Sequence, residues 1–466
     1  MSLFGILNQG ARSMRTATAA VQTSSNNVAN ANTPGYARQS LGFSAVGTQR
    51  RGGLLVGQGV TASQVNSAYD RFSQGAVFGR MSNNGYASSR SASFQTIESY
   101  LSEGPDGGLG AELTQFFDLW SAMETDPSAQ APRLAVLGQA EFLSTQFNSS
   151  ASQLVTQQQN ADARVDAAVA RANVIGGQVA ALNSQIVQLE SSGGLANDLR
   201  ANRTALLEEL AAMGPVRVDD NADGSARVLF ANHVLVEGAE SRALSVVADP
   251  ITGFNQVHIG QGSTSLNITA ALTGGSIGAD IDVRDTVVAG LITQLDTLAF
   301  EVANQVNALH NAGFGLDGLS GRDFFAPPAA LVGAAQALQV DVAVALTPDA
   351  IAAASTAAGL PGDNTNATAI AALAGQNLMA GGTQTFERFY SSMTAGLGQD
   401  ASQAYQLEAR TTLELEGAQN LRDSASAVSL EEEAMDLIRF QDAYSASARV
   451  VSVTNELLQE LLNVVR

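Results

Sequence analysis

The sequence predicts a mainly α fold with β insertions (α+β), in which paired terminal coiled-coil helices join a long central helix bundle and small outward β-rich domains. Three observations support this fold class. Apolar residues recur at alternating three- and four-residue steps near both ends of the chain, which is the spacing of a coiled-coil seam. The longest helical tract covers 130–192. Between 216 and 275, short apolar runs separated by Asp, Asn and Gly indicate a small antiparallel β unit.

The first helix is predicted over 3–29. The large apolar residues of its seam include Leu7, Met14, Val21 and Val28. An Asn-rich run followed by Thr-Pro-Gly ends the helix near Ala31, because Asn side chains compete for backbone hydrogen bonds and Pro disfavours a helical residue before it. One weak seam on one short helix is marginal in isolation, so this helix needs packing partners.

The middle of the chain is divided by the same periodicities. Extended segments with turns are predicted over 36–66. Helices are predicted over 87–102, 109–126, 130–192, 196–213, 281–312, 384–396 and 400–427. The polar run at 157–160 marks an interruption or bend in the longest helix, and residues 313–383 are irregular and rich in Gly and Ala.

The last helix begins with a capping box, in which Ser429 and Glu432 satisfy each other's backbone donors. Its seam includes Leu437, Tyr444, Val451, Leu458 and Leu462. A second apolar face joins the seam near the C-terminus and consists of Val450, Val453, Leu457, Leu461 and Val464. A helix that is apolar on two faces must be buried by more than one neighbour, so other subunits are expected to cover it.

These elements group into four predicted domains. Residues 1–35 and 429–466 form a terminal coiled-coil domain. Residues 36–215 and 276–428 form a central helical domain with extended segments at its start. Residues 216–275 form the small antiparallel β unit, and residues 313–383 form an irregular Gly/Ala-rich outward insertion.

Composition excludes several kinds of chemistry. The chain of 466 residues has no Cys, and all 24 of its Lys and Arg residues are Arg. Thiol catalysis, a Walker-type phosphate loop and a Schiff-base lysine are therefore excluded. Three His are too few and too scattered for a metal site, so no metal and no cofactor are expected.

Charge is unevenly distributed along the chain. The net charge is −20, yet residues 1–97 hold eight Arg and one acidic residue, a net charge of +7, while residues 400–466 carry −7. Opposite charges at the two ends favour their pairing, and the overall acidity argues against nucleic acid as a partner. No apolar run reaches the ~18–20 residues that span a bilayer, so no membrane insertion is expected.

The N-terminus also lacks the features of a secretory signal. Its Arg-rich, Ser-rich and acid-poor start is similar to an organelle transit peptide. That interpretation explains neither the Asn-Pro-Gly helix exit nor the far end of the chain.

The two ends resemble the signatures of the bacterial flagellar axial proteins, which are the rod, hook and hook-associated subunits. At the N-terminal end the matching residues are Asn26, Asn27, Asn30, Asn32, Gly35 and Tyr36. At the C-terminal end the match is Arg439-Phe440-Gln441 followed by Ala443-Tyr444. Between them, segments that contain Trp120, Asn183, Asn202 and Asn307 are similar to the hook-associated subunits.

This resemblance implies a structural, non-enzymatic subunit that forms the junction between hook and filament. The implied partners are copies of itself in a homo-oligomeric ring or tube, the hook protein, the next junction protein, and an export chaperone on the C-terminal helix. It also implies export as an unfolded chain through the flagellar secretion channel to an extracellular location. The alternative is another axial subunit, of the hook or distal-rod type. The residues expected at the assembly interface are Leu7, Met14, Val21, Val28, Leu437, Tyr444, Val451, Leu458 and Leu462.

Two motifs have competing interpretations. Residues 274–278 match a nucleophile elbow at Ser276, with His310 downstream, but a Gly-rich turn between a β unit and a helix gives the same pattern. Residues 219–224 match the first half of a calcium loop, yet the position of its bidentate Glu holds Phe230, so a hairpin turn explains them better. His310 is expected to be a packed or capping residue.

Overall fold

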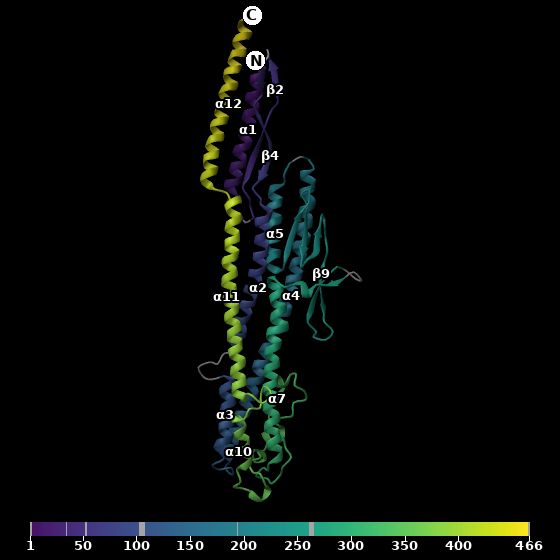
Figure 1. Cartoon of the computed structure of the whole chain (residues 1–466), viewed down its shortest axis with the longest axis vertical. Coiled ribbons are helices and arrows are strands. Elements are labelled where there is room, and N and C mark those ends of the chain that lie inside the picture. Colours follow the sequence, from purple (N-terminus) through teal and green to yellow (C-terminus); the bar gives the residue numbers. More distant parts are fainter. Residues whose placement is uncertain are drawn as a thin grey trace. The chain divides into compact units, whose positions relative to one another are not determined.

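Long helices and a few small sheets make up the fold, which confirms the predicted mainly α class with β insertions (Figure 1). The structure is a computed structural model, and it describes residues 2–33, 35–51, 54–101, 108–192, 194–260 and 265–464. The chain divides into a first unit of Met1–Tyr86, Ala167–Ile277 and Arg410–Arg466, and a second unit of Ala87–Asp166 and Gly278–Ala409. Four helices have residues in both units: α2 (Arg71–Leu101), α4 (Gln130–Glu190), α6 (Gly275–Asp282) and α11 (Phe386–Ser426).

In the first unit, the helices from the two ends of the chain pack against each other. α1 (Leu3–Ala29) and α12 (Leu430–Val464) lie side by side in Figure 1, as the sequence predicted. One half of the predicted capping box of α12 is present, because Ser429 Oγ accepts a hydrogen bond from the Glu432 N–H at 3.4 Å. The Glu432 carboxylate lies 2.9 Å from Arg38 instead of bonding the Ser429 N–H. α5 (Asn197–Met213) agrees with the helix expected over 196–213.

The predicted extended segment after α1 is a long antiparallel hairpin. Its strands are β1 (Gln39–Ala45), β2 (Thr48–Arg51), β3 (Leu54–Gly57) and β4 (Val60–Ser67). β1 pairs with β4 and β2 with β3, with Gln39 opposite Ser67 and a register shift between Gly42 and Phe43. The strands β1 and β4 also lie against α1.

The predicted antiparallel β unit consists of two sheets. The first is four-stranded, in the order β5 (Val216–Asp220), β6 (Ala226–Phe230), β7 (His233–Glu237) and β8 (Glu240–Ser241). The second is three-stranded and contains β9 (Leu244–Ala248), β10 (Asn255–Ile259) and β11 (Leu266–Asn267), with β10 in the middle. A short 3-10 turn at Thr269–Ala271 follows.

The second unit has one large apolar core. It is built from α2, α4 and α11 together with α3 (Leu109–Met123), α7 (Ala289–Ala312), α8 (Ala334–Ala337), α9 (Val342–Ala345) and α10 (Thr365–Ala371). Short 3-10 turns at Pro348–Ala350, Ala357–Gly359 and Ala372–Gly375 connect the small helices. The buried aromatic residues at its centre include Phe116, Trp120, Phe147, Phe324 and Phe325. Residues 313–383, which were predicted to be irregular, contain the short helices α8, α9 and α10 between irregular stretches, and they contribute Phe324 and Phe325 to this core.

Asparagine side chains attach the strands and loops to the helices. Asn183 of α4 accepts from the Ala226 N–H at 3.0 Å and donates to the Ala226 C=O at 2.8 Å. Asn173 holds Leu244 in the same way, and Asn307 holds Phe325. We call an Asn that bonds both backbone groups of one residue an amide clamp. Because an amide carries one acceptor and two donors, it replaces the partner strand that the residue lacks.

Several helix boundaries differ from the sequence expectation. α2 begins at Arg71, well before the predicted residue 87. α4 runs without a break through the polar run at 157–160, and α11 is one helix where two were predicted. The helix predicted over 281–312 starts with α6 (Gly275–Asp282) and passes through a π turn at Val283–Val288 before α7. The sequence predicts helix ends at these polar and Gly residues. The helices nevertheless continue, because tertiary packing of the neighbouring apolar residues outweighs the low helix propensity of these positions.

One helical stretch among the described residues, Gly275–Ala312, is long and apolar enough to cross a membrane by length and composition. This corrects the expectation that no such stretch exists. Leu295, Leu298 and Val302 of this stretch are completely buried in the core of the second unit, which is the arrangement of a core helix.

The buried His310 makes the stability of the second unit sensitive to acid. Burial lowers its pKa to about 4 from an ordinary value of 6.5. The unfolded chain therefore binds the proton first, and stability should fall by up to about 3 kcal/mol as the pH drops from about 6.5 to 4. Urea unfolding at pH 7 and pH 4.5 measures this loss. His310→Gln should flatten the pH dependence, and an unchanged slope in that variant would contradict the assignment.

Candidate assembly interface

The Asn-rich signature forms a buried joint where α1 ends and β1 begins. Asn27 is 1% exposed and is an amide clamp on Gln39, whose N–H donates to Asn27 Oδ1 at 2.9 Å and whose C=O accepts from Asn27 Nδ2 at 2.8 Å. The Tyr36 hydroxyl donates to the same Oδ1 at 2.9 Å. Burial, together with the charges of Asp198 and Glu433, raises the pKa of Tyr36 to about 12, so the hydroxyl keeps its proton. The helix end, the loop and the first strand are thus joined at one side chain.

The neighbouring signature residues shape the loop. Asn30 caps α1, because its N–H and its side chain both donate to the Asn26 C=O. Gly35 has φ +76°, and a Cβ there would lie 3.2 Å from the Ala201 C=O of α5, so both the backbone conformation and the close approach favour glycine. Asn32 and Gln441 are exposed, and nothing in the structure explains why they belong to the signature. Pro34 lies outside the described residues.

Arg38 connects this joint to the last helix. Its guanidinium lies 2.9 Å from Glu432, 2.7 Å from Glu433 and 3.5 Å from Asp436, all in the first two turns of α12. Its backbone N–H donates to the Ser426 C=O at the end of α11 at 2.8 Å. The hydrogen bond to Glu433 raises the pKa of Arg38, so the cation is permanent. Glu433 is 1% exposed, and a carboxylate so deeply buried requires this partner.

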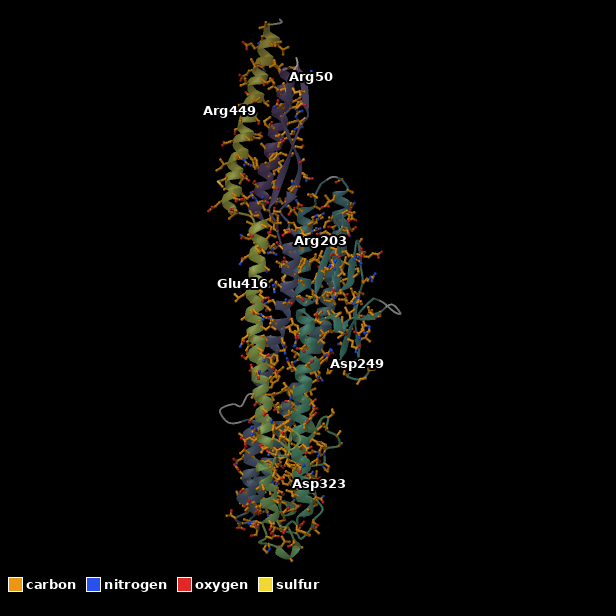
Figure 2. All side chains as sticks on the ribbon, viewed as in Figure 1. Arg50, Arg203, Asp249, Asp323, Glu416 and Arg449 are labelled. Atoms are coloured by element: carbon orange, nitrogen blue, oxygen red, sulfur yellow. The ribbon has the colours of Figure 1, made fainter. Side chains whose placement is uncertain are left out.

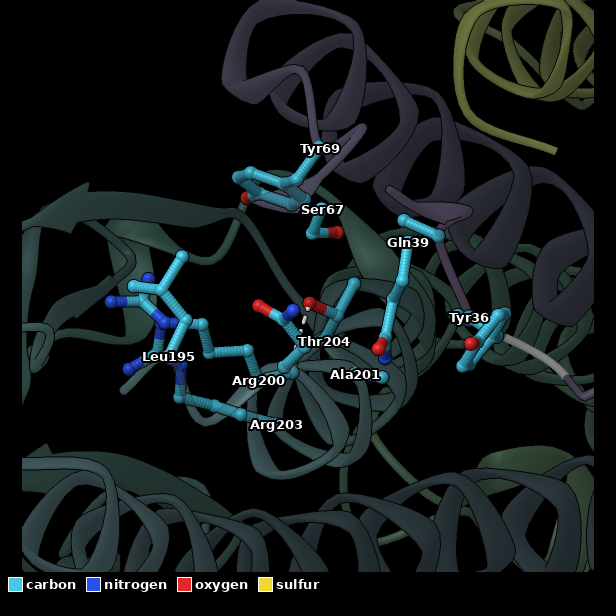
Figure 3. Close-up of a pocket in the computed structure, with 12 residues that line it drawn as sticks. Tyr36, Gln39, Ser67, Tyr69, Leu195, Arg200, Ala201, Arg203 and Thr204 are labelled. Atoms are coloured by element: carbon cyan, nitrogen blue, oxygen red, sulfur yellow. Dashed lines mark hydrogen bonds between the residues drawn. The ribbon is translucent and has the colours of Figure 1, made fainter. Parts of the chain in front are cut away.

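A cavity of about 250 Å³ lies beside the loop. Figure 3 shows Arg200 and Arg203 on one side of it and Tyr36 on the other, with Gln39 between them. Both arginines have partners within the chain: Arg200 makes two 2.8 Å bonds to Glu190, and Arg203 donates to Asn183 Oδ1 at 2.8 Å and to the Gly224 C=O at 3.0 Å. This pairing argues against an anion site in the cavity.

The face that α1 buries is not the predicted seam. Its buried residues are Gly10, Thr16, Ala17, Ala20, Ser24 and Asn27. All except Thr16 lie one residue before a position of the predicted seam (11, 18, 21, 25 and 28), or about 100° around the helix. The small side chains let α12 approach closely, since a Cβ at position 10 would lie 2.7 Å from Cγ2 of Val451. The sequence does contain a signal for this face, namely the small residues Gly10, Ala17 and Ser24 at seven-residue spacing. The spacing of large apolar residues alone does not indicate it.

The predicted interface residues are therefore only partly covered within one copy. Leu7, Met14, Val21, Leu437, Val451 and Leu458 are half-buried, and Val28, Tyr444 and Leu462 are exposed. On α12 a further group of large apolar side chains is exposed: Met435, Ile438, Val450, Val453, Leu457, Leu461 and Val464. In Figure 2, Arg449 marks this helix, and Arg50 marks strand β2 of the hairpin. Exposed apolar side chains aligned on one helix are typical of a surface that a partner covers.

The two motifs with a possible chemical role have structural explanations. Gly275 has φ +69° and packs against the Met213–Gly214 backbone, so the Gly-rich string is a tight turn into α6. Both ring nitrogens of His310 are bonded to backbone, Nδ1 to the Arg322 C=O and Nε2 to the Ala352 N–H, as expected for a packed residue and unsuited to a general base. Residues 221–225 form the β5–β6 turn. In the described part of the chain, no cluster of three or more His, Cys, Asp or Glu could hold a metal ion.

Comparison with known proteins assigns the family. A family model described as the flagellar hook-associated protein FlgK helical domain matches residues 94–325, and one described as the flagellar basal body rod FlgEFG protein C-terminal matches residues 422–464. Flagellar hook-associated protein 1 of Bacillus subtilis (strain 168) is 29% identical over 99% of this chain and 98% of its own length. The chain belongs to the flagellar hook-associated protein family.

Other hook-associated proteins agree with this assignment. Flagellar hook-associated protein 1 of Escherichia coli (strain K12) is 25% identical over 98% of this chain and 99% of its own length. The structure of the flagellar hook junction protein FlgK from Burkholderia pseudomallei has the same fold, with a TM-score of 0.68 at 16% identity, and the match covers 76% of this chain and 100% of that one. As a hook-associated protein, the chain is a structural component of the bacterial flagellum.

Replacing Asn27 by Leu tests whether the joint orders the N-terminal segment. Leu has a similar volume but leaves the Gln39 N–H and C=O unpaired in a buried site, which should cost about 2–4 kcal/mol of local stability. Hydrogen exchange should then accelerate over α1 and β1. Asn32→Leu is the matched control, since it changes an exposed Asn of the same signature. Equal exchange in the two variants would show that Asn27 does not hold the joint.

Proposed function

We propose that this protein joins hook to filament in the bacterial flagellum, and that its terminal helices provide the contacts between subunits. The exposed apolar side chains of α12 carry the proposal. Leu462 is 66% exposed and Ile438 is 61% exposed, although burial of such a side chain contributes about 1.5–3 kcal/mol. The half-buried seam positions of α1 and α12 add to this surface. Copies of the chain, arranged in a ring or tube, would bury it.

The same proposal assigns a place to each predicted domain. Residues 1–35 and 429–466 line the inner tube of the axial structure, and the central helical domain forms the next layer. Residues 216–275 and 313–383 face outward. The hook protein and the next junction protein contact the two faces of the ring.

The same exposed apolar surface of α12 has a consequence for the chain before it assembles. We propose that the chain crosses the flagellar secretion channel unfolded and reaches the cell exterior, and that a cytoplasmic chaperone covers the apolar faces of α12 before export. A side chain that a subunit partner covers in the assembly needs a substitute while the chain is alone.

A hook or distal-rod subunit is the second candidate. The match at residues 422–464 to a rod-protein C-terminal model supports it, because rod and hook-associated proteins share this end. The match of residues 94–325 to the hook-associated helical domain favours the junction. Electron microscopy of cells that lack this protein separates the two: hooks without filaments support the junction role, and missing hooks or filaments that remain attached contradict it.

Leu462→Asp tests the assembly surface. The side chain is exposed, so the monomer should fold as before, while a charge in a subunit contact should block filament attachment. The measurement is the fraction of hooks that carry filaments in cells whose only copy is the variant, with circular dichroism of the purified monomer as the folding check.

Asn463→Asp is the matched control, because it adds the same charge one residue away on α12. It should retain most of the filament attachment. Normal attachment by Leu462→Asp would remove Leu462 from the interface.

A further inference from the structure

The helix that runs from α6 to α7 contains a π turn at Val283–Val288. A π turn accommodates an extra residue in the helix, has poorer hydrogen-bond geometry than an α turn, and occurs mostly at functional positions. It is also one of the few features at which helices bend sharply. This turn is not explained by the proposed assembly surface.

α4 holds the π turn through two side chains that are one helical turn apart. Gln158 Nε2 donates to the Arg284 C=O at 2.9 Å, and Asp162 accepts from Arg284 Nη1 at 2.6 Å. Asp285 accepts from Arg284 Nε at 2.7 Å. The Arg284 side chain is only 3% exposed. The polar run at 157–160 does not interrupt α4, and one of its residues, Gln158, has a role in satisfying a backbone carbonyl of the neighbouring π turn.

The turn belongs to a layer of charged residues in the second unit, of which Arg284 and Asp280 are buried and the others are partly exposed. Arg164 pairs with Asp280 at 2.8 Å, and Ser89 donates to the same carboxylate at 3.2 Å. Arg90 of α2 lies 3.3 Å from Asp282. Burial raises the pKa of Asp280. The layer thus ties α2 and α4 to the segment that leads into the π turn.

Buried ion pairs are poor stabilisers, because desolvation offsets most of their attraction. They are, however, specific: Arg284 Nη1 donates to Asp162 of α4 while its Nε and Nη2 donate to Asp285, and a shift of one residue would turn the guanidinium about 100° away from Asp162. The layer also borders the apolar core, to which Val283 and Val288 of the π turn themselves belong. At this level the bundle is therefore held by directional bonds in addition to close packing.

We propose that the π turn at 283–288 is a flexible joint in the helix from α6 to α7, and that Gln158 and Asp162 hold the joint closed. When the two side chains release Arg284, the helix bends at the turn, while α7 stays seated in its core. The joint allows the segment before the turn to move without loss of the apolar packing after it.

Deletion of Thr286 tests the joint. This residue is exposed, and because a π turn uses one residue more than an α turn, its removal restores a continuous α-helix without rotating the flanking faces. In the full-length protein, amides 283–288 should exchange at least about tenfold faster than those of the flanking α-helices, and the deletion should slow them to the flanking rate. Thr286→Ala, which retains the turn, should behave as the wild type.

A second variant tests whether the side chains of α4 restrain the π turn. Gln158→Leu/Asp162→Leu should accelerate exchange at 283–288 at least about tenfold and leave exchange in α3 and α10 unchanged. The proposed flexible joint is contradicted if the amides of the wild-type turn exchange as slowly as those of the flanking helices, or if the double variant does not accelerate their exchange.

A cellular measurement addresses its role and rests on the proposed junction function. Cells with the Thr286 deletion should attach at least about tenfold fewer filaments than cells with Thr286→Ala, although the protein is equally stable. Full attachment by the deletion variant would overturn a role for the joint. Failure of the junction function itself would be seen separately, as attached filaments in cells without the protein.

Discussion

The amide clamp of Asn27 on Gln39 fixes the position of β1 relative to the end of α1. α1 has few large apolar residues, so its packing energy alone does not fix where the chain leaves the helix. A single buried side chain supplies a donor and an acceptor to the backbone of Gln39 and also accepts from Tyr36. Breaking it would leave the buried N–H and C=O of Gln39 unpaired, and each unpaired group costs more than a hydrogen bond contributes.

The same device recurs wherever a helix carries non-helical chain. Asn173 and Asn183 attach the two small sheets to α4, and Asn307 attaches the irregular segment to α7. The strands of the two sheets are short, although they bury apolar residues such as Val228, Phe230 and Val257. The directional bonds add to this packing and attach each sheet to α4 at a defined residue. The segment 313–383 has only short helices and turns, and Asn307 bonds the backbone of Phe325 while the Phe325 ring packs against Phe116 at 5.7 Å between centroids.

The net charge of the chain is distributed unequally between its two units. The second unit holds six Arg and 23 acidic residues, a net charge of −17, so nearly all of the excess negative charge of the chain lies there. The first unit is almost balanced, because it holds 18 Arg and 21 acidic residues. Some of its arginines pair with acidic residues far away in sequence, as Arg38 does with Glu433 and Arg422 with Glu208. In the second unit the paired charges are concentrated in the layer around Arg284.

Sequence patterns by themselves determined the fold class, the helix at each end, the antiparallel strands and the family, because each of these depends on local periodicity or on a contiguous motif. They also placed the signature, but they could not distinguish the buried Asn27 from the exposed Asn32, since both stand in the same run of Asn. The tertiary structure decided which face of α1 is buried, that Arg38 pairs with Glu433, that α4 and α11 continue through polar residues, and that a π turn precedes α7. These features depend on groups that are distant in the chain, and no local pattern records which distant group will satisfy a buried donor or fill the space beside a glycine.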